Sequence, residues 1–504
     1  MPSSRDHDPA WNPGLVEAFA CPQPDERPDV WPRGVTRLKD GHLALHGQRL
    51  AEILHSTQAH TPVFVLDVDH FEDTAKAYST AFAKHFDVPG MSGAQVHYAG
   101  KAFLTTGIAK IAASHGLGID TASEGELRVA LASGCPAELI GLHGNAKKPE
   151  LIRLALRAGI GRIIADSLAE VRRISRVANE EGLRAPVMLR ITTGVHAGGH
   201  DFIATAHEDQ KFGLSLESGE EGWPSPAMQA AQMVDEYPNT ELVGLHSHIG
   251  SQIFDMTAFE AAASKMLAFR KDLADQGIDV PELDLGGGYP VAYTDADPHA
   301  PSPDEVARIL AQVVRKECEQ LGTDVPKVSV EPGRSIIAPT TMTLYTVVNV
   351  KDQRIGENAD GTPVYRRYVS VDGGMSDNIR PALYGSAYTA TVASRVSDAD
   401  LVACRVVGAH CESGDILIFH LALPMDIAEG DLLAMPVTGA YGDVMSSNYN
   451  MLARPGTLGV QAGASGQVAA RWLRTPETLE TLFSRDPDYS TVVIPQADED
   501  RSEA

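Results

Sequence analysis

Eight short apolar runs alternate with helical stretches between about residues 60 and 335, and this alternation constrains the fold more than any other feature. The helical stretches open with capping signals, as at Ser123, Ser167 and Thr257, each followed three residues later by Glu, and at Ser302-Pro303. Eight strand–helix units predict a (β/α)8 barrel rather than an open sheet. The runs are VHYAGK (96–101), LGID (117–120), IGLHGN (140–145), RIIADS (162–167), VMLRITTG (187–194), LVGLHSHIG (242–250), ELDLGGG (282–288) and VSVEPGR (328–334).

After residue 335 the pattern changes to apolar runs separated by Gly, Asp and Pro, which is typical of β-structure. Helical periodicity is absent there until about residue 476, and DGHLALHGQ (40–48) is also strand-like. We therefore expect an α/β barrel plus a C-terminal β-domain that includes an N-terminal strand. The predicted divisions are a disordered arm (1–34), an N-terminal strand segment joining the β-domain (35–60), the barrel (61–335), the β-domain (336–475), and a C-terminal helix with an acidic tail (476–504).

The formal charge of −25, with no Lys/Arg cluster to offset it, argues against a nucleic-acid or anionic-membrane partner. No stretch approaches the ~20 apolar residues of a membrane span, and no secretory signal opens the chain. The cysteines are odd in number, scattered and without CxxC spacing. That usage is typical of a reducing cytoplasm rather than of a disulfide framework.

Polar side chains end nearly every predicted barrel strand. The carboxyl ends of barrel strands form the open, rigid face where chemistry gathers, so we expect a ligand there. The residues in question are Lys101, Asp120, His143, Asn145, Asp166, Arg190, His246, His248, Gly286, Gly287, Gly288 and the segment from Glu331 to Arg334.

Lys101 and the pair His246/His248 each admit two interpretations. Lys101 could extend to the barrel mouth as a packing residue, or serve as a Schiff-base lysine whose pKa is lowered by desolvation. The HxH pair could bind a metal, but metal-dependent barrel hydrolases carry HxH on the first strand. Here it lies on the sixth, so we expect no metal.

Gly286, Gly287 and Gly288 follow strand seven, where exposed backbone N–H groups could cradle a phosphate. Glu331 could hold a protonated heterocyclic nitrogen and Arg334 a substrate carboxylate, although the two could simply pair with each other. An amine, an imidazole, a phosphate cradle and a carboxylate are together what pyridoxal 5'-phosphate requires.

Cys411, in HCESGD (410–415), could be a nucleophile, a metal ligand, half of a disulfide or a small core residue. The odd cysteine count weakens the disulfide reading, and the core reading stays open on residue type alone.

The sequence resembles the diaminopimelate decarboxylase family of barrel-type pyridoxal-phosphate decarboxylases. Matching segments occur in order from about residue 40 to 460, and several are long enough to be specific. They are YAGKAF, LHGN, TAHEDQKFGLS, GLHSHIGSQI, DLGGGYP, VEPGRSI, VSVDGGMSDNIRPALYG, HCESGD and TGAYGDVMSSNYNMLARP.

The resemblance implies an alanine-racemase-like barrel with a β-domain, and a head-to-tail homodimer whose active sites are shared. It implies that Lys101 holds the cofactor covalently and His248 stacks on its ring. Glu331 would lie at the pyridine nitrogen, and Cys411 with Glu412 would enter from the other subunit, the thiol as proton donor. The remaining cofactor ligands would be Ser251, Gly286, Gly287, Gly288, Gly333, Arg334 and Tyr441, and the substrate ligands Arg334, Arg380, Tyr384, Glu412 and Tyr441.

The expected reaction is decarboxylation of meso-2,6-diaminopimelate to L-lysine, because two arginines near the substrate favour a second carboxylate over a cationic end. The alternatives are a related decarboxylase acting on a modified diaminopimelate, a carboxylated polyamine, ornithine or arginine, or a non-catalytic homologue. Two features depart from the family pattern: Asp443-Val444, where a carboxylate could repel the substrate or face solvent, and an unusually long N-terminal arm.

Overall fold

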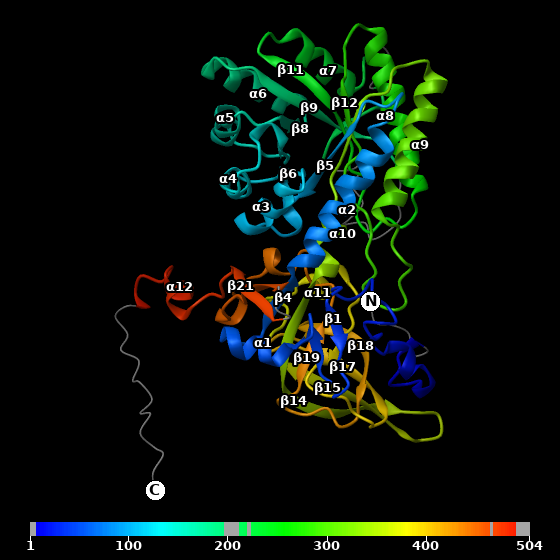
Figure 1. Cartoon of the computed structure of the whole chain (residues 1–504), viewed down its shortest axis with the longest axis vertical. Helices are drawn as coiled ribbons and strands as arrows, with labels where there is room; N and C mark the ends of the chain where they lie inside the picture. Colours follow the sequence, from blue (N-terminus) through cyan, green and yellow to red (C-terminus); the bar gives the residue numbers. More distant parts are fainter. Residues whose placement is uncertain (1–6, 196–210, 219–222, 464–466, 490–504) are drawn as a thin grey trace.

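The computed structural model describes residues 7–195, 211–218, 223–463 and 467–489. A barrel and a β-rich part lie one above the other (Figure 1). Part of the TAHEDQKFGLS segment, residues 205–210, lies outside the described residues.

The barrel is closed, as predicted. Its parallel strands pair in chain order, β13 returns to pair with β5, and β9 pairs with both β8 and β11. Each of the eight predicted runs carries one strand. They are β5 (Ala94–Ala99), β6 (Gly118–Thr121), β7 (Ile140–Leu142), β8 (Arg162–Ala165), β9 (Ala185–Thr192), β11 (Thr240–His246), β12 (Glu282–Asp284) and β13 (Lys327–Val330), with the short β10 (Leu214–Ser215) beside β9.

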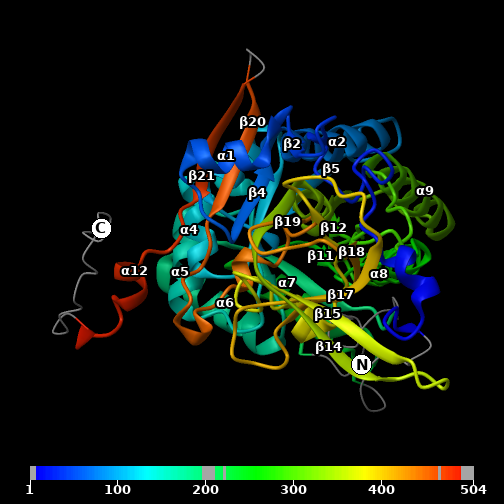
Figure 2. The same cartoon turned by 90° about the horizontal axis from the view of Figure 1, so that it is seen from below.

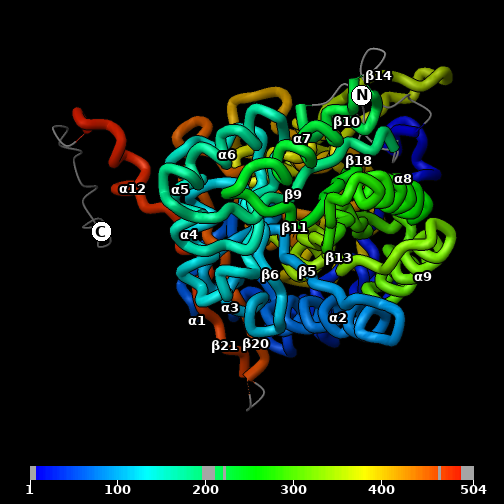
Figure 3. Tube along the Cα trace, turned by 90° about the horizontal axis from the view of Figure 1, so that it is seen from above, coloured from blue at the N-terminus to red at the C-terminus, as the bar shows by residue number. Residues whose placement is uncertain are grey.

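Helices surround the strands (Figure 3). Side chains of Ser123, Ser167 and Ser302 cap α4, α6 and α9 as expected. The signal at Thr257 was misplaced: Met256 is the N-cap, and the Thr257 N–H donates to Asp255 Oδ1 at 2.9 Å. The helices are α2 (Val68–Phe86), α3 (Thr106–Ser114), α4 (Glu124–Ala132), α5 (Pro149–Ala158), α6 (Leu168–Glu181), α7 (Pro226–Glu236), α8 (Thr257–Asp275), α9 (Pro303–Leu321) and the short α10 (Arg334–Ile337).

The β-domain is built on one sheet in the order β18-β17-β15-β14-β4-β20-β21, with β19 pairing β14 and β16 (Figure 2). A short helix, α11 (Arg380–Tyr384), interrupts the stretch in which we expected none. The strands are β14 (Thr341–Glu357), β15 (Pro363–Val371), β16 (Thr391–Val392), β17 (Leu401–Val407), β18 (Ile416–Pro424), β19 (Leu432–Met435), β20 (Thr457–Ala462) and β21 (Val468–Arg474).

The N-terminal strand within this sheet is β4 (Val63–Asp67). All five β4 residues are buried, and the strand pairs β14 on one side and β20 on the other. A continuous apolar run suits such an interior strand. Residues 40–48 fold back at His46-Gly47, where both φ angles are positive, into a small sheet of β1 (Val35–Arg37), β2 (Leu43–Leu45) and β3 (Gln48–Arg49), followed by α1 (Leu50–Thr57). This sheet is joined to the β-domain, because the Leu43 N–H donates to the Ala393 carbonyl at 2.9 Å.

Residues 7–34 are ordered, which corrects the expectation of a disordered arm. A 3-10 helix, η2 (Pro13–Phe19), packs against β17 and β18, and Ala20 bridges Ala422. Trp31 is 1 % exposed, and its indole N–H donates to the Pro22 carbonyl at 2.8 Å. Burial of the Trp31 side chain stabilises the arm against the disorder that its Pro- and Asp-rich composition favours. At the other end, helix α12 (Leu479–Phe483) projects from the body (Figure 1), and the acidic tail lies outside the described residues.

Candidate active site

Two neighbouring cavities, of about 360 and 270 Å³, open where the carboxyl ends of the barrel strands meet the β-domain. Lys101 and His248 line both of them. The larger cavity also draws on Ser251, Gln252, Tyr293, Asp297, Arg334, Arg380, Tyr384, Ser386, Ala387, Tyr441 and Met445, and the smaller on Asp120, Glu126, His143, Asn145, Arg190, Phe212, His246 and Glu331. The two domains therefore build one site together.

Lys101 follows β5 directly, in a 3-10 turn at Gly100–Ala102. Its side chain is exposed and lines both cavities. We expected a desolvated amine, and the protein by itself does not bury this one. The turn is tied to the β-domain, because the Tyr441 N–H donates to the Ala102 carbonyl at 2.9 Å. Tyr441 has φ +62°, a conformation that holds its ring at the cavity wall.

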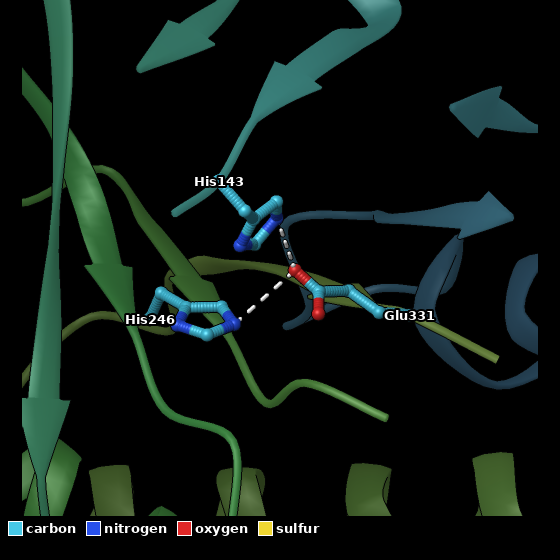
Figure 4. Close-up of side chains that lie close together, drawn as sticks. All are labelled: His143, His246 and Glu331. Carbon is cyan, nitrogen blue, oxygen red and sulfur yellow. Dashed lines mark ion pairs between the residues drawn. The ribbon is translucent and has the colours of Figure 1, made fainter. Parts of the chain in front are cut away.

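Glu331 lines the smaller cavity, and its carboxylate faces two imidazoles (Figure 4). Its Oε1 is 3.0 Å from His143 Nε2 and 3.2 Å from His246 Nε2. Burial would raise the pKa of Glu331, but the two imidazoles hold it well below its usual range. Burial would lower the pKa of His143, but Glu331 and Asp120 raise it to about 9. The pair is therefore a carboxylate and an imidazolium near neutral pH.

The trio of His143, His246 and Glu331 is compact enough to hold a metal ion, since its ligand atoms lie within 4.8 Å of one another. A metal ion would have to displace the proton of His143, whose pKa is raised by Glu331 and Asp120. The cluster is better described as a buried ion-pair network.

This network fits a protonated ring nitrogen. Glu331 lines the smaller cavity with a carboxylate whose lowered pKa keeps it ionised, and a carboxylate has acceptor sites beyond the ion pairs that Oε1 makes with His143 and His246. A pyridinium N–H entering the smaller cavity could donate to this carboxylate, so the residues present suit pyridoxal phosphate.

His246 and His248 have separate tasks. His246 is fully buried against Glu331, and burial lowers its pKa to about 4 despite that carboxylate. His248 lies just beyond β11 and lines both cavities, where it could contact a ring. Its Nδ1 accepts the Gly287 N–H at 3.2 Å, which fixes the ring orientation.

The backbone packs so closely around the three glycines after β12 that there is no room for a side chain. A Cβ on Gly286, Gly287 or Gly288 would lie 2.4 Å or less from a carbonyl oxygen of a neighbouring segment. The N–H groups of Gly286 and Gly287 donate to Asp284 Oδ1 and His248 Nδ1, so the protein itself uses two of the three predicted phosphate donors. None of the three, nor Gly333, is among the described residues lining either cavity.

The larger cavity carries two guanidiniums, one from each domain. Arg334, at the start of α10, donates to Ser251 Oγ at 2.9 Å and to the Tyr293 hydroxyl. Arg380, at the start of α11, donates to Tyr388 Oη at 2.9 Å and to Ser386 Oγ at 3.1 Å. No acidic partner neutralises either one in the described contacts, which makes this an anion site.

Tyr293 was missed by the sequence reasoning. It lies within the larger cavity, and both arginines approach its ring, at 5.9 Å (Arg334) and 5.7 Å (Arg380) from the centroid. Burial would raise the pKa of Tyr293, but the two guanidiniums lower it. A signal existed: a tyrosine in the loop after the seventh strand, at the face where ligands bind.

Cys411 and Glu412 lie outside the site of their own chain. Both are exposed, in the loop between β17 and β18, and neither is among the described residues lining the cavities. The Cys411 N–H donates to Asn450 Oδ1 at 3.2 Å. All five cysteines are free, which excludes the disulfide reading, and exposure excludes the core reading.

Asp443 is buried rather than facing solvent, and it is not among the described residues lining either cavity. It is 6 % exposed, accepts from Thr457 Oγ1 at 3.0 Å and pairs with Arg474 of β21. It therefore fastens the Tyr441 loop to the β20–β21 hairpin, away from the two cavities.

Known proteins are similar to this chain in sequence and in fold. Residues 69–338 match the family model described as "Pyridoxal-dependent decarboxylase, pyridoxal binding domain". A diaminopimelate decarboxylase from Corynebacterium efficiens is 43% identical over 94% of this chain and 97% of its own length. The Mycobacterium tuberculosis protein of the same name is 44% identical over 91% of this chain and 97% of its own.

The structure comparison agrees. The crystal structure of diaminopimelate decarboxylase from M. jannaschii in complex with L-lysine superposes with a TM-score of 0.78 at 29% identity, covering 92% of this chain and 98% of that one. Within the described residues, no helix is long and apolar enough to cross a membrane. The chain belongs to the pyridoxal-dependent decarboxylases and, among them, to the diaminopimelate decarboxylase family.

Proposed function

We propose that the chain removes carbon dioxide from meso-2,6-diaminopimelate to give L-lysine, the last step of bacterial lysine biosynthesis. The observation that carries this proposal is the placement of Arg334 and Arg380 in the same cavity as Lys101. Two uncompensated guanidiniums attract a second carboxylate and repel the cationic far end of ornithine or lysine.

Pyridoxal phosphate, when bound, supplies an electron sink for the charge left as carbon dioxide departs. Lys101 would hold it covalently, His248 would contact its ring, and Glu331 would accept a hydrogen bond from the pyridine nitrogen. The phosphate would lie toward Ser251, Gly333, Arg334 and Tyr441, with Gly288 beside them. The low pKa of Glu331 keeps that carboxylate ionised, as the pairing with a protonated ring requires.

The substrate's far carboxylate would lie between Arg334 and Arg380, beside Tyr384 and Tyr441. Tyr384 is 5.8 Å from the Arg380 guanidinium, measured to its ring centroid, and it lines the larger cavity. This arrangement holds the end of the substrate that is not decarboxylated. It disfavours the alternative substrates that lack a second carboxylate.

The active unit is a homodimer in this proposal. Cys411 and Glu412 are exposed and outside the cavities of their own chain, so they would complete the site of the partner. There the thiol delivers a proton to the carbon from which carbon dioxide has left, and Glu412 contacts the substrate. The five free cysteines support a cytoplasmic location.

Replacing Arg380 tests the carboxylate site. We expect Arg380→Gln to lower kcat/KM for diaminopimelate about 100-fold or more, because a charge-assisted, two-pronged contact is lost. Arg380→Lys should recover only part of this, since an ammonium lacks the planar fork. Steady-state kinetics with cofactor titration are the measurement.

Arg308→Gln, on an exposed position of α9, is the matched control and should leave kcat/KM unchanged. Cofactor affinity should be retained in all three variants. An unchanged kcat/KM for diaminopimelate in Arg380→Gln would contradict the proposed substrate site.

A further inference from the structure

The N-terminal arm contacts the loop that carries Tyr293. Arg27, 9 % exposed, donates from Nη1 to the Asp295 carbonyl at 2.8 Å and to Asp295 Oδ1 at 3.1 Å. Its Nη2 reaches the Asp297 carbonyl at 3.2 Å. Asp29 orients the guanidinium through bonds of 2.9 and 3.0 Å. A nearly buried arginine thus binds the loop through three acceptors.

Asp297 passes this contact on to Tyr293. Its Oδ2 accepts the N–H groups of Tyr293 and Thr294, both at 2.9 Å, and the Thr294 hydroxyl at 3.2 Å. These bonds close the loop into a compact turn. The backbone position of Tyr293 therefore depends on the segment that Arg27 holds.

Tyr293 lies between the two cavity arginines. Its hydroxyl accepts a hydrogen bond from Arg334 Nη1. Its ring stands edge-on to the ring of Tyr388, with 5.1 Å between the centroids, and the Tyr388 hydroxyl accepts a hydrogen bond from Arg380 Nε. Arg334 belongs to the barrel and Arg380 to the β-domain. The Tyr293 side chain thus lies between the two guanidiniums and sets the distance between them.

The arm itself is anchored on the β-domain. Helix η2 packs on β17 and β18, and Ala20 bridges Ala422, whereas Asp295 and Asp297 follow β12 of the barrel. In Figure 1 the dark-blue N-terminal segment lies at the junction of the two parts. Arg27 therefore joins the two domains that contribute one arginine each.

We propose that Arg27 is a positioning residue for substrate specificity: it fixes the Tyr293 loop across the domain junction and so sets the spacing of Arg334 and Arg380. This rests on the proposed role of those arginines as the site for the far carboxylate. The long N-terminal arm then has a function, because it carries Arg27 to the rim of the cavity.

The test compares Arg27→Gln and Asp295→Asn, which remove the positive and the negative charge of the same ion pair, with Arg33→Gln. Arg33 lies on the same arm, but its side chain is 56% exposed and its ion-pair partner is Asp73 at 3.5 Å. We expect Arg27→Gln to raise KM for diaminopimelate about tenfold with kcat changed less than about twofold, because the far carboxylate is held less well before and during reaction alike. Asp295→Asn should shift KM in the same direction by less, and Arg33→Gln should not.

A readout independent of catalysis is hydrogen exchange in the cofactor-free protein. Exchange in the peptide spanning residues 291–299 should rise in Arg27→Gln and Asp295→Asn but not in Arg33→Gln. Combining Arg27→Gln with Tyr293→Phe should cost less than the sum of the single effects on KM, since both act through one side chain.

Unchanged exchange at 291–299 and unchanged KM in Arg27→Gln would overturn the proposal. The proposal would also be overturned if Arg27→Gln lowered kcat and the melting temperature and raised KM while Asp295→Asn behaved like the native protein. That result would show that Arg27 contributes only to general stability. If the native enzyme releases no carbon dioxide from diaminopimelate, the proposed function fails instead, and the exchange experiment still decides whether Arg27 holds the loop.

Discussion

Lys101→Ala should abolish activity and leave the purified protein colourless. Among the described residues, Lys101 is the one lysine that lines both cavities, at the end of β5 and within the space bounded by His248 and Glu331. Loss of the residue that binds the cofactor covalently removes both its anchor and its route to the substrate. We expect a fall in kcat of at least about 1000-fold, measured as carbon dioxide release, and loss of the visible absorbance of lysine-bound cofactor.

Lys110→Ala is the matched control. Lys110 lies on α3, exposed and outside both cavities, so its removal should change neither the rate nor the spectrum. A Lys101→Ala protein that stays yellow and active would show that another amine holds the cofactor.

Mixing two inactive chains should restore activity if sites are shared between subunits. Cys411→Ala lacks the proton donor, and Lys101→Ala lacks the cofactor anchor, yet a mixed dimer contains one site with both groups intact. Random exchange makes half of the dimers mixed, each with one good site of two, so recovery should approach about a quarter of native activity. The assay is carbon dioxide release after subunit exchange.

The control mixes Lys101→Ala with the double variant Lys101→Ala/Cys411→Ala, in which no dimer has an intact site. That mixture should stay inactive. Absence of recovery in the first mixture, with exchange proven by differently tagged subunits, would remove the shared-site proposal and leave Cys411 without the assigned role.

Local sequence patterns were sufficient to predict the barrel. β-branched runs, capping residues and polar strand ends act over a few residues, and all eight predicted runs carry strands. The gathering of Lys101, His248, Glu331 and Arg334 also followed from topology, because parallel strands place their carboxyl ends on one face.

Contacts between residues far apart in the sequence could not be predicted from such local patterns. β4 is an apolar run like those of the barrel strands, and only its pairing with β14 and β20 shows that it belongs to the β-domain sheet. Asp443 looked like a charge near the substrate, because its partner Arg474 is 31 residues away in sequence. Arg27 lies 268 residues from Asp295, so nothing local in the arm's composition indicated that it would be held.

The domain boundaries and the residue roles at the cofactor remain predictions, although the geometry favours most of them. The glycines are exceptions: none of Gly286, Gly287, Gly288 and Gly333 is among the described residues lining either cavity, and the N–H groups of Gly286 and Gly287 already have acceptors within the protein. At Gly286 and Gly287 the requirement is steric: a side chain there would collide with the backbone around Ser247 and Glu331.

The most direct measurement is carbon dioxide release by the purified, cofactor-loaded enzyme from meso-diaminopimelate, ornithine, arginine and lysine under identical conditions. The placement of Arg334 and Arg380 predicts that diaminopimelate is used with a kcat/KM at least about 100-fold above any of the others. A preference for ornithine, arginine or lysine would contradict the assignment of the two arginines as the site for a second carboxylate.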